Sequence, residues 1–187
     1  MASSVPAERR RVLLAAGAVV MAVLLVLVGA LLGGWRPFTP TPDVLSFGPG
    51  GDLAAFTLFE GQCASGDLAA GGTFGPESDA QCGNPHDVEV VAARAPIGQG
   101  RPVGYPGEAA LARYGQAYCA LFVDSDLLAP TSSGVDRGDL RMTAVIPSEA
   151  AFLDPGSDVG SASGTRQVSC VVSRTDGEKL TDRFSVI

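Results

Sequence analysis

The longest apolar stretch of the chain covers residues 12–32, in which no side chain carries a charge. At about 1.5 Å of rise per residue, this stretch forms a helix of about 31 Å, which matches a bilayer core of about 30 Å. Three arginines at positions 9–11 precede it, and positively charged flanks remain in the cytoplasm. The pattern predicts a cytoplasmic tail over residues 1–11, one transmembrane helix over residues 12–33, and an extracytoplasmic C-terminal part.

A cleaved signal peptide is the alternative interpretation of this stretch. Such a peptide has an apolar region of about 7–15 residues that ends in small residues before the cleavage site. The run here is longer, and residues 28–32 form a poor cleavage sequence. Trp35 and Arg36 follow, and both suit an anchor at the membrane interface. We therefore expect an uncleaved anchor.

Proline and glycine are frequent immediately after the apolar stretch. Pro37, Pro40 and Pro42 predict a stiff, extended spacer, and a glycine-rich turn sequence follows at residues 47–52. We assign residues 34–52 to a linker and residues 53–187 to one extracytoplasmic domain, because a segment of this length suits a single domain.

One segment of this domain has the periodicity of an amphipathic helix. After a Tyr-Pro-Gly turn, five small or apolar residues fall on one helical face, at offsets 0, 4, 7, 8 and 11. They are Leu111, Gly115, Tyr118, Cys119 and Phe122. This helix is the clearest in the domain, and a shorter helical turn is expected after Ser148.

Strand patterns surround that helix. They are rich in β-branched and apolar residues and are bounded by glycine, proline and aspartate. We expect a C-terminal hairpin around a Thr-Asp-Gly turn, because its glycine tolerates positive φ. The fold class that follows is α+β, a small antiparallel sheet with one main helix. The expected strands are residues 54–59, 88–92 and 140–146, with hairpin arms at 167–173 and 180–187.

Charge differs between the two sides of the apolar stretch. Residues 35–187 hold nine arginines, one lysine and nineteen acidic residues, a balance of −9. An acidic domain argues against nucleic acid or anionic lipid headgroups as partners. With 24 glycines and 13 prolines the chain is loop-rich, which favours stabilisation by disulfides.

All four cysteines lie on the side predicted to be oxidising, so disulfides are expected. Three pairings exist, and we favour Cys63–Cys82 with Cys119–Cys170, since the second would tie the inner helix face to the first hairpin arm. Zinc is the alternative, but the spacings are not C-x-x-C and the chain has one histidine. We expect no metal and no cofactor.

Several short motifs, taken in order, resemble the septum formation family of membrane-anchored actinobacterial proteins. That family carries G-D-C, C-x-x-P-H-D-x-E-V, Y-P-G, a helix with a cysteine, and a final G-x-R-x-x-C. The resemblance implies an envelope protein associated with cell division or septum assembly. Here Gln62 replaces the first aspartate, Phe152 stands where the family often has tryptophan, and the last motif has one extra residue. The matching segments are residues 61–63, 82–90, 105–107, 119–122 and 164–170.

His86 is the only histidine of the chain. One interpretation is structural: Asn84 to Asp87 form a turn, and His86 caps the next strand and packs on a Cys63–Cys82 bridge. The other makes Pro85, His86, Asp87 and Glu89 a polar recognition surface for a partner protein or a cell-wall glycan.

The sequence therefore predicts a single-pass membrane protein that acts by binding, without a catalytic residue, as an accessory of the cell envelope or division machinery. The alternative is a sortase-like cysteine transpeptidase, in which Cys170, His86 and Arg183 occur in the chain order of that class. It requires a free Cys170 thiol beside a cation.

Overall fold

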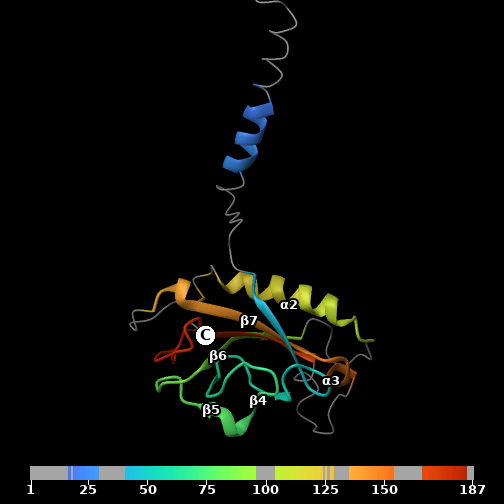
Figure 1. Cartoon of the computed structure of the whole chain (residues 1–187), viewed down its shortest axis with the longest axis vertical. Coiled ribbons are helices and arrows are strands. Elements are labelled where there is room, and N and C mark those ends of the chain that lie inside the picture. Colours follow the sequence, from blue (N-terminus) through green and yellow to red (C-terminus); the bar gives the residue numbers. More distant parts are fainter. Residues whose placement is uncertain are drawn as a thin grey trace, which may run out of the picture. The chain divides into compact units, whose positions relative to one another are not determined.

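A computed structural model describes residues 17, 19–29, 41–95, 104–123, 125, 127–128, 135–153 and 166–184. The chain divides into two compact units, Met1–Pro40 and Thr41–Ile187 (Figure 1). The predicted cytoplasmic tail, the two ends of the predicted transmembrane helix and residues 34–40 of the predicted linker lie outside the described residues.

In the first unit, residues 19–29 are helical. Their large apolar side chains are exposed, from 44% at Leu27 to 71% at Val26. Within the described part of the chain, we find no helix with the length and hydropathy needed to span a bilayer.

The second unit is built on a six-stranded sheet with the strand order β1-β7-β8-β6-β3-β5. β1 and β7 are parallel and the other neighbours are antiparallel. The sheet strands are β1 (Asp43–Phe47), β3 (Cys63–Ala64), β5 (Asp79–Ala80), β6 (Val88–Arg94), β7 (Leu140–Pro147) and β8 (Val168–Arg174). A separate parallel pair joins β2 (Ala55–Phe56) to β4 (Thr73–Phe74). The α+β class with a mostly antiparallel sheet and one main helix is confirmed.

The main helix, α2 (Glu108–Val123), packs across β7 and β8 on one face of the sheet (Figure 1). It lies close because its central residue on that face is Gly115. A Cβ added there would come within 3.1 Å of the Ala144 Cβ and 3.2 Å of the Ile146 Cγ2. Leu111, Gly115 and Cys119 are its buried residues, as the helical periodicity predicted.

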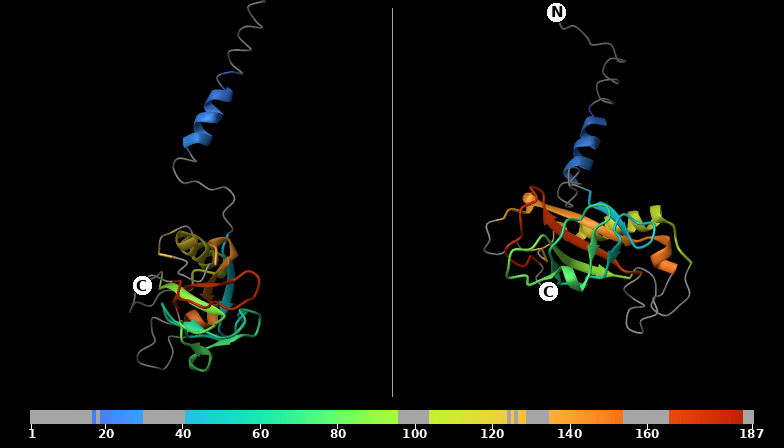
Figure 2. Two further views of the ribbon diagram at one scale, coloured as in Figure 1. Left: turned by 90° about the vertical axis from the view of Figure 1, so that its left-hand side faces the viewer. Right: turned by 60° about the horizontal axis from the view of Figure 1, so that its bottom comes forward.

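The opposite face carries the pair β2 and β4, whose buried residues pack against the sheet. Figure 2 gives two further views of this arrangement. Phe47, Phe56 and Phe74 form a chain of ring contacts with centroids 6.1 Å and 5.8 Å apart. They belong to a core that includes Val145 and Val171 of the sheet. Shorter elements complete the unit: η1 (Pro76–Ser78), η2 (Arg137–Asp139) and α3 (Glu149–Leu153).

The start of the domain differs from the prediction. Residues 43–47, which we assigned to the linker, form β1 and pair with β7 along their whole length. Near its end, the edge of β1 that faces away from β7 is occupied by two hydrogen bonds. The Ser46 N–H donates to Asp52 Oδ2 at 2.8 Å, and the Leu53 N–H donates to the Ser46 carbonyl. The strand expected at residues 54–59 is reduced to β2, which has only two residues.

The prediction of a C-terminal hairpin is wrong for its second arm. β8 forms as the first arm, and the turn after it contains Gly177 at φ +75°. The chain then leaves β8 and does not return to it. Leu180 instead forms an antiparallel bridge with His86, through backbone hydrogen bonds of 2.9 and 2.8 Å. The neighbours of β8 are β6 and β7, so neither of its edges is open to a returning arm.

Candidate functional site

The four cysteines form two disulfides, Cys63–Cys82 and Cys119–Cys170, the pairing favoured from the sequence. Cys119 and Cys170 are completely buried between α2 and the sheet. Cys170 therefore carries no thiol that could act as a nucleophile in this structure. Arg183 lies beside the other bridge, with its Nη2 3.8 Å from Cys82 Sγ, and not beside Cys170.

His86 belongs to a group that we call the motif corner, which consists of the buried residues Cys63, His86 and Glu89 and the half-buried Cys82. The exposed fractions of His86 and Glu89 are both 0%. The His86 Nδ1 lies 2.8 Å from the Asn84 carbonyl oxygen, which accepts its hydrogen bond. One ligand-type atom each from Cys63, His86 and Glu89 lie within 4.8 Å of one another.

The motif corner attaches the C-terminal segment to β6. The Phe184 N–H donates to Glu89 Oε2 at 2.7 Å, and Phe184 itself is fully buried. Arg183 donates to the Gly61 carbonyl at 2.9 Å, near the Cys63–Cys82 bridge. Glu89 is polar yet inward-facing, because this C-terminal segment covers its face of β6.

Two of the four predicted recognition residues are thus inaccessible. His86 and Glu89 are buried, so they cannot contact a partner at the surface. Pro85 is exposed and Asp87 is half-buried. Asp87 lines a cleft of the described part of the chain.

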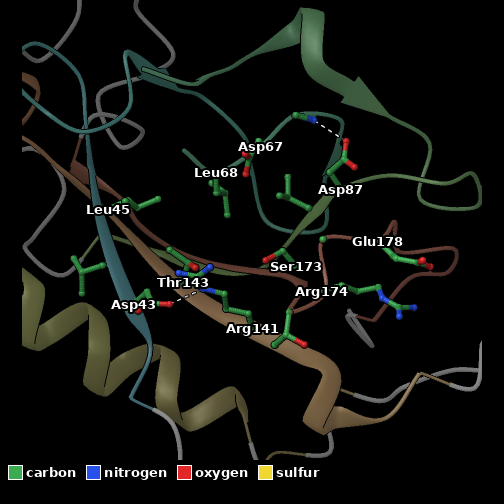
Figure 3. Close-up of a pocket in the computed structure, with 15 residues that line it drawn as sticks. Asp43, Leu45, Asp67, Leu68, Asp87, Arg141, Thr143, Ser173, Arg174 and Glu178 are labelled. Carbon is green, nitrogen blue, oxygen red and sulfur yellow. Dashed lines mark hydrogen bonds and ion pairs between the residues drawn. The ribbon is translucent and has the colours of Figure 1, made fainter. Parts of the chain in front are cut away.

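That cleft, which we call the β1 cleft, has a volume of about 590 Å³, within the range of ligand sites. Its walls come from the starts of β1, β6 and β7, the end of β8 with its following turn, and the loop at residues 66–68. Figure 3 shows the loop that carries Asp67 and Leu68 lying across the cleft from Thr143 and Ser173.

Most charges of the β1 cleft are paired. Arg141 Nε lies 2.6 Å from Asp43 Oδ2, and both side chains are more than half exposed (Figure 3). Arg174 pairs with Asp176 in the turn after β8, and this hydrogen-bonded contact holds the pKa of Asp176 at about 2. Exposed pairs of this kind contribute little to stability, so they remain available for exchange with a charged ligand.

Asp87 connects the cleft to the motif corner. It accepts two hydrogen bonds of 2.9 Å from the Lys179 ammonium and one of 2.8 Å from the Gly66 N–H. Partial burial raises the pKa of Asp87, but these bonds and the charge of Lys179 outweigh burial and bring the pKa below its ordinary value. Asp87 is thus ionised and holds the 66–68 loop in place.

Two acids of the cleft have no such partner. Among the described residues, neither Asp67 nor Glu178 forms an ion pair, and both line the cleft. The cleft therefore presents a net negative charge.

One side of the β1 cleft is an open strand edge. The Ser46 N–H and carbonyl point away from β7, as their bonds to Asp52 and Leu53 show. Val44 lies two residues earlier in the same strand, so its N–H and carbonyl point the same way. No described residue bonds them, and Val44 lines the cleft.

A second hollow of about 770 Å³ lies near the start of α2. Three of its polar side chains, those of Ser46, Asp52 and Ser148, already serve the fold. Hydrogen bonds from Ser46 lower the pKa of Asp52 and attach it to β1. The Ser148 hydroxyl accepts from the Ala151 N–H at the start of α3 and donates to the Pro49 carbonyl. The β1 cleft is therefore the better candidate for a ligand.

No family model, curated protein or solved structure matches the chain. The resemblance to the septum formation family stays a prediction from the motifs alone.

Proposed function

We propose that the chain is a single-pass membrane protein whose extracytoplasmic domain binds a partner in the cell envelope through the β1 cleft. The partner segment is an extended peptide with lysine or arginine side chains. The observation that carries this proposal is the combination of an open β1 edge with two unpaired acids in one cleft.

The strand edge supports a peptide as ligand. An extended peptide can add to a sheet edge through main-chain hydrogen bonds, with pockets for alternate side chains giving selectivity. Val44 offers one N–H and one carbonyl for this purpose. Leu45 and Leu68 add apolar surface within the cleft, while Thr143 and Ser173 supply hydroxyl groups.

Charge supports a basic partner. Asp67 and Glu178 present negative charge outside the ion pairs of the described residues, and complementary charge raises association rates and selects partners. A lysine or arginine of the added strand would complete these two positions.

The membrane assignment rests on the N-terminal sequence. An uncharged stretch follows three arginines, and the helical part at residues 19–29 exposes its apolar side chains. A bilayer would cover those side chains. Two disulfides suit an oxidising location outside the cytoplasm.

The motif resemblance adds a role in division or septum assembly. A fluorescent fusion in growing cells tests it, since a septal role predicts enrichment at midcell. Uniform labelling of the cell outline would count against that role. The transpeptidase alternative is disfavoured, because Cys170 is bridged to Cys119 and Arg183 lies at the other disulfide.

Binding is tested with the full chain in detergent micelles and a displayed library of random octapeptides. We expect enriched peptides to contain lysine or arginine, and their binding to protect the Val44 amide from hydrogen exchange. The double variant Asp67→Lys/Glu178→Lys should lose binding. The matched control Glu77→Lys/Asp79→Lys reverses two exposed acids outside the cleft and should keep it.

Enriched peptides that bind both double variants equally would contradict this site. Binding of cell-wall glycan fragments, with no peptide enrichment, would assign the cleft to a carbohydrate instead.

A further inference from the structure

The motif corner contains one buried polar atom without a hydrogen-bond partner among the described residues. His86 Nε2 is buried and has no hydrogen-bond partner among the described residues. Buried polar atoms in folded proteins are almost always satisfied, so an orphaned nitrogen needs an explanation. This nitrogen belongs to the ring that lies, with Glu89 and Cys63, in a cluster of ligand-type atoms within 4.8 Å of one another.

The imidazole is oriented as in a metal-binding histidine. Its Nδ1 faces the Asn84 carbonyl, which only accepts hydrogen bonds, so Nδ1 carries a proton. Nε2 is then the ring nitrogen that can offer a lone pair to a metal ion. A backbone carbonyl that fixes the other ring nitrogen is the usual outer partner of a metal-binding histidine.

The neighbouring donors are held with similar rigidity. Cys63 of β3 and Glu89 of β6 are direct cross-strand partners. The Phe184 N–H orients the Glu89 carboxylate by donating to its Oε2. Cys82 is attached to Cys63 through the disulfide. The Cys63 sulfur, a His86 ring nitrogen and a Glu89 oxygen thus lie close together, and the Cys82 sulfur is bonded to that of Cys63.

We propose that the motif corner binds one Zn²⁺ ion when the Cys63–Cys82 disulfide is reduced, with Cys63, Cys82, His86 and Glu89 as ligands. Two thiolates, an imidazole and a carboxylate are a tetrahedral set that zinc accepts. The disulfide and the metal are then alternative cross-links of the same corner.

The chemistry balances with a dithiol as reductant. The dithiol gives two electrons and two protons to the Cys63–Cys82 bond and becomes a disulfide, leaving two cysteine thiols. Zinc then displaces the two thiol protons, which pass to solvent. The same site exists in a newly made chain, before the bridge has formed.

The Cys63–Cys82 bridge should be reduced before the Cys119–Cys170 bridge, because one of its cysteines is partly exposed. Cys82 is half-buried, whereas Cys119 and Cys170 are both 0% exposed. Attack at Cys82 would release Cys63 as the buried thiolate, whereas neither cysteine of the other bridge is exposed.

The test uses the full chain in detergent micelles, reduced with a phosphine under nitrogen, and a chromophoric chelator that competes for zinc. We expect one zinc per reduced chain and none per oxidised chain. With Co²⁺ in place of zinc, the reduced chain should show thiolate-to-metal charge transfer and the intense d–d bands of a tetrahedral site. An oxidised chain that binds zinc as tightly as the reduced one would overturn the proposal.

A matched pair of variants identifies the site. His86→Gln should weaken zinc binding at least about 100-fold, because losing a ligand costs more than losing an outer-shell partner. Glu77→Gln, at an exposed residue outside both the motif corner and the β1 cleft, should leave zinc binding within about threefold of the wild type. Unchanged affinity in His86→Gln would refute the assignment.

If the His86→Gln variant does not fold, X-ray absorption at the zinc edge of the wild-type chain provides the test instead. Two sulfur and two nitrogen or oxygen neighbours around zinc in the wild type support the site, and any other set contradicts it. The proposal is independent of the β1 cleft, so its failure leaves peptide binding untouched.

Discussion

The two disulfides should differ in their effect on stability, and the buried one should matter more. In the chain-entropy description, a cross-link stabilises the fold by restricting the unfolded chain, and the restriction grows with the loop that it closes. Cys119 and Cys170 are 51 residues apart, and Cys63 and Cys82 are 19 apart. At these loop lengths the Cys119–Cys170 bridge contributes about 4 kcal/mol and the Cys63–Cys82 bridge about 3 kcal/mol.

Removal of the Cys119–Cys170 bridge also affects packing. Cys119 lies on the buried face of α2, and both sulfurs of the Cys119–Cys170 bridge are in the core that includes Ala144 and Val172. The variant Cys119→Ala/Cys170→Ala therefore loses the cross-link and two buried sulfur atoms. A loss of about 4 kcal/mol or more is a large part of the 5–15 kcal/mol by which domains are stable.

This loss is measured by denaturing the full chain in urea and monitoring its secondary structure by far-UV circular dichroism. With a slope of about 1.5–2 kcal/mol per molar urea, the midpoint should fall by about 2–3 M. The variant Cys63→Ala/Cys82→Ala should fall by less. Reduced wild-type chain in the presence of a chelator is the control that breaks both cross-links and keeps every sulfur atom in place.

A midpoint shift below about 1 M for Cys119→Ala/Cys170→Ala would refute this reasoning. So would a larger loss from the Cys63–Cys82 pair, since the shorter loop has less entropy to restrict.

Three further predictions concern the packing of α2, the cleft and the motif corner. Gly115→Val should lower the free energy of unfolding by about 1–3 kcal/mol in urea titrations, because its side chain would press on Ala144 and Ile146; equal stability would show that the helix can move away. The pKa of Asp87 lies below its ordinary value of 3.8, so the unfolded chain takes up this proton first and stability falls as pH drops below about 4. Asp87→Asn should remove part of that fall between pH 5 and 2.5, and an unaltered pH profile would argue against the contact with Lys179. Glu89→Leu should cost about 1–3 kcal/mol, because the buried Phe184 N–H loses its acceptor, while Glu89→Gln should cost less; calorimetric melting of the two variants compares them.

The sequence was sufficient for the elements with a strong local signal. The helical face with Leu111, Gly115 and Cys119 has a clear period, and it became α2. Strands β6, β7 and β8 were found because each is a run of mostly apolar residues. The disulfide pairing followed from the placement of Cys119 on the inner helix face.

The missed elements depend on contacts between distant residues. β1 has only five residues, lies next to prolines and glycines, and gains its strand conformation from β7, about a hundred residues later. Glu89 looked like a surface residue because it is charged. It is buried because Phe184 supplies a hydrogen bond from a segment that the sequence placed in a hairpin.

The β1 cleft could not be predicted from the sequence for the same reason. It joins segments of β1, β6, β7, β8 and the 66–68 loop, none of which carries a motif in the lining residues other than Asp87. The only signal of the cleft in the sequence was polar residues at strand ends, such as Asp43 and Arg141, and these are common at any sheet edge.

The central claim, that the β1 cleft receives a partner on the outer side of the membrane, is tested most directly by photo-crosslinking in growing cells. A benzophenone amino acid is placed at position 178 in the cleft and, as control, at position 77 outside it. The account predicts a covalent adduct with an envelope protein at position 178 that disappears in the Asp67→Lys variant, and no such adduct at position 77. The same adduct at both positions, or none at position 178, would contradict it.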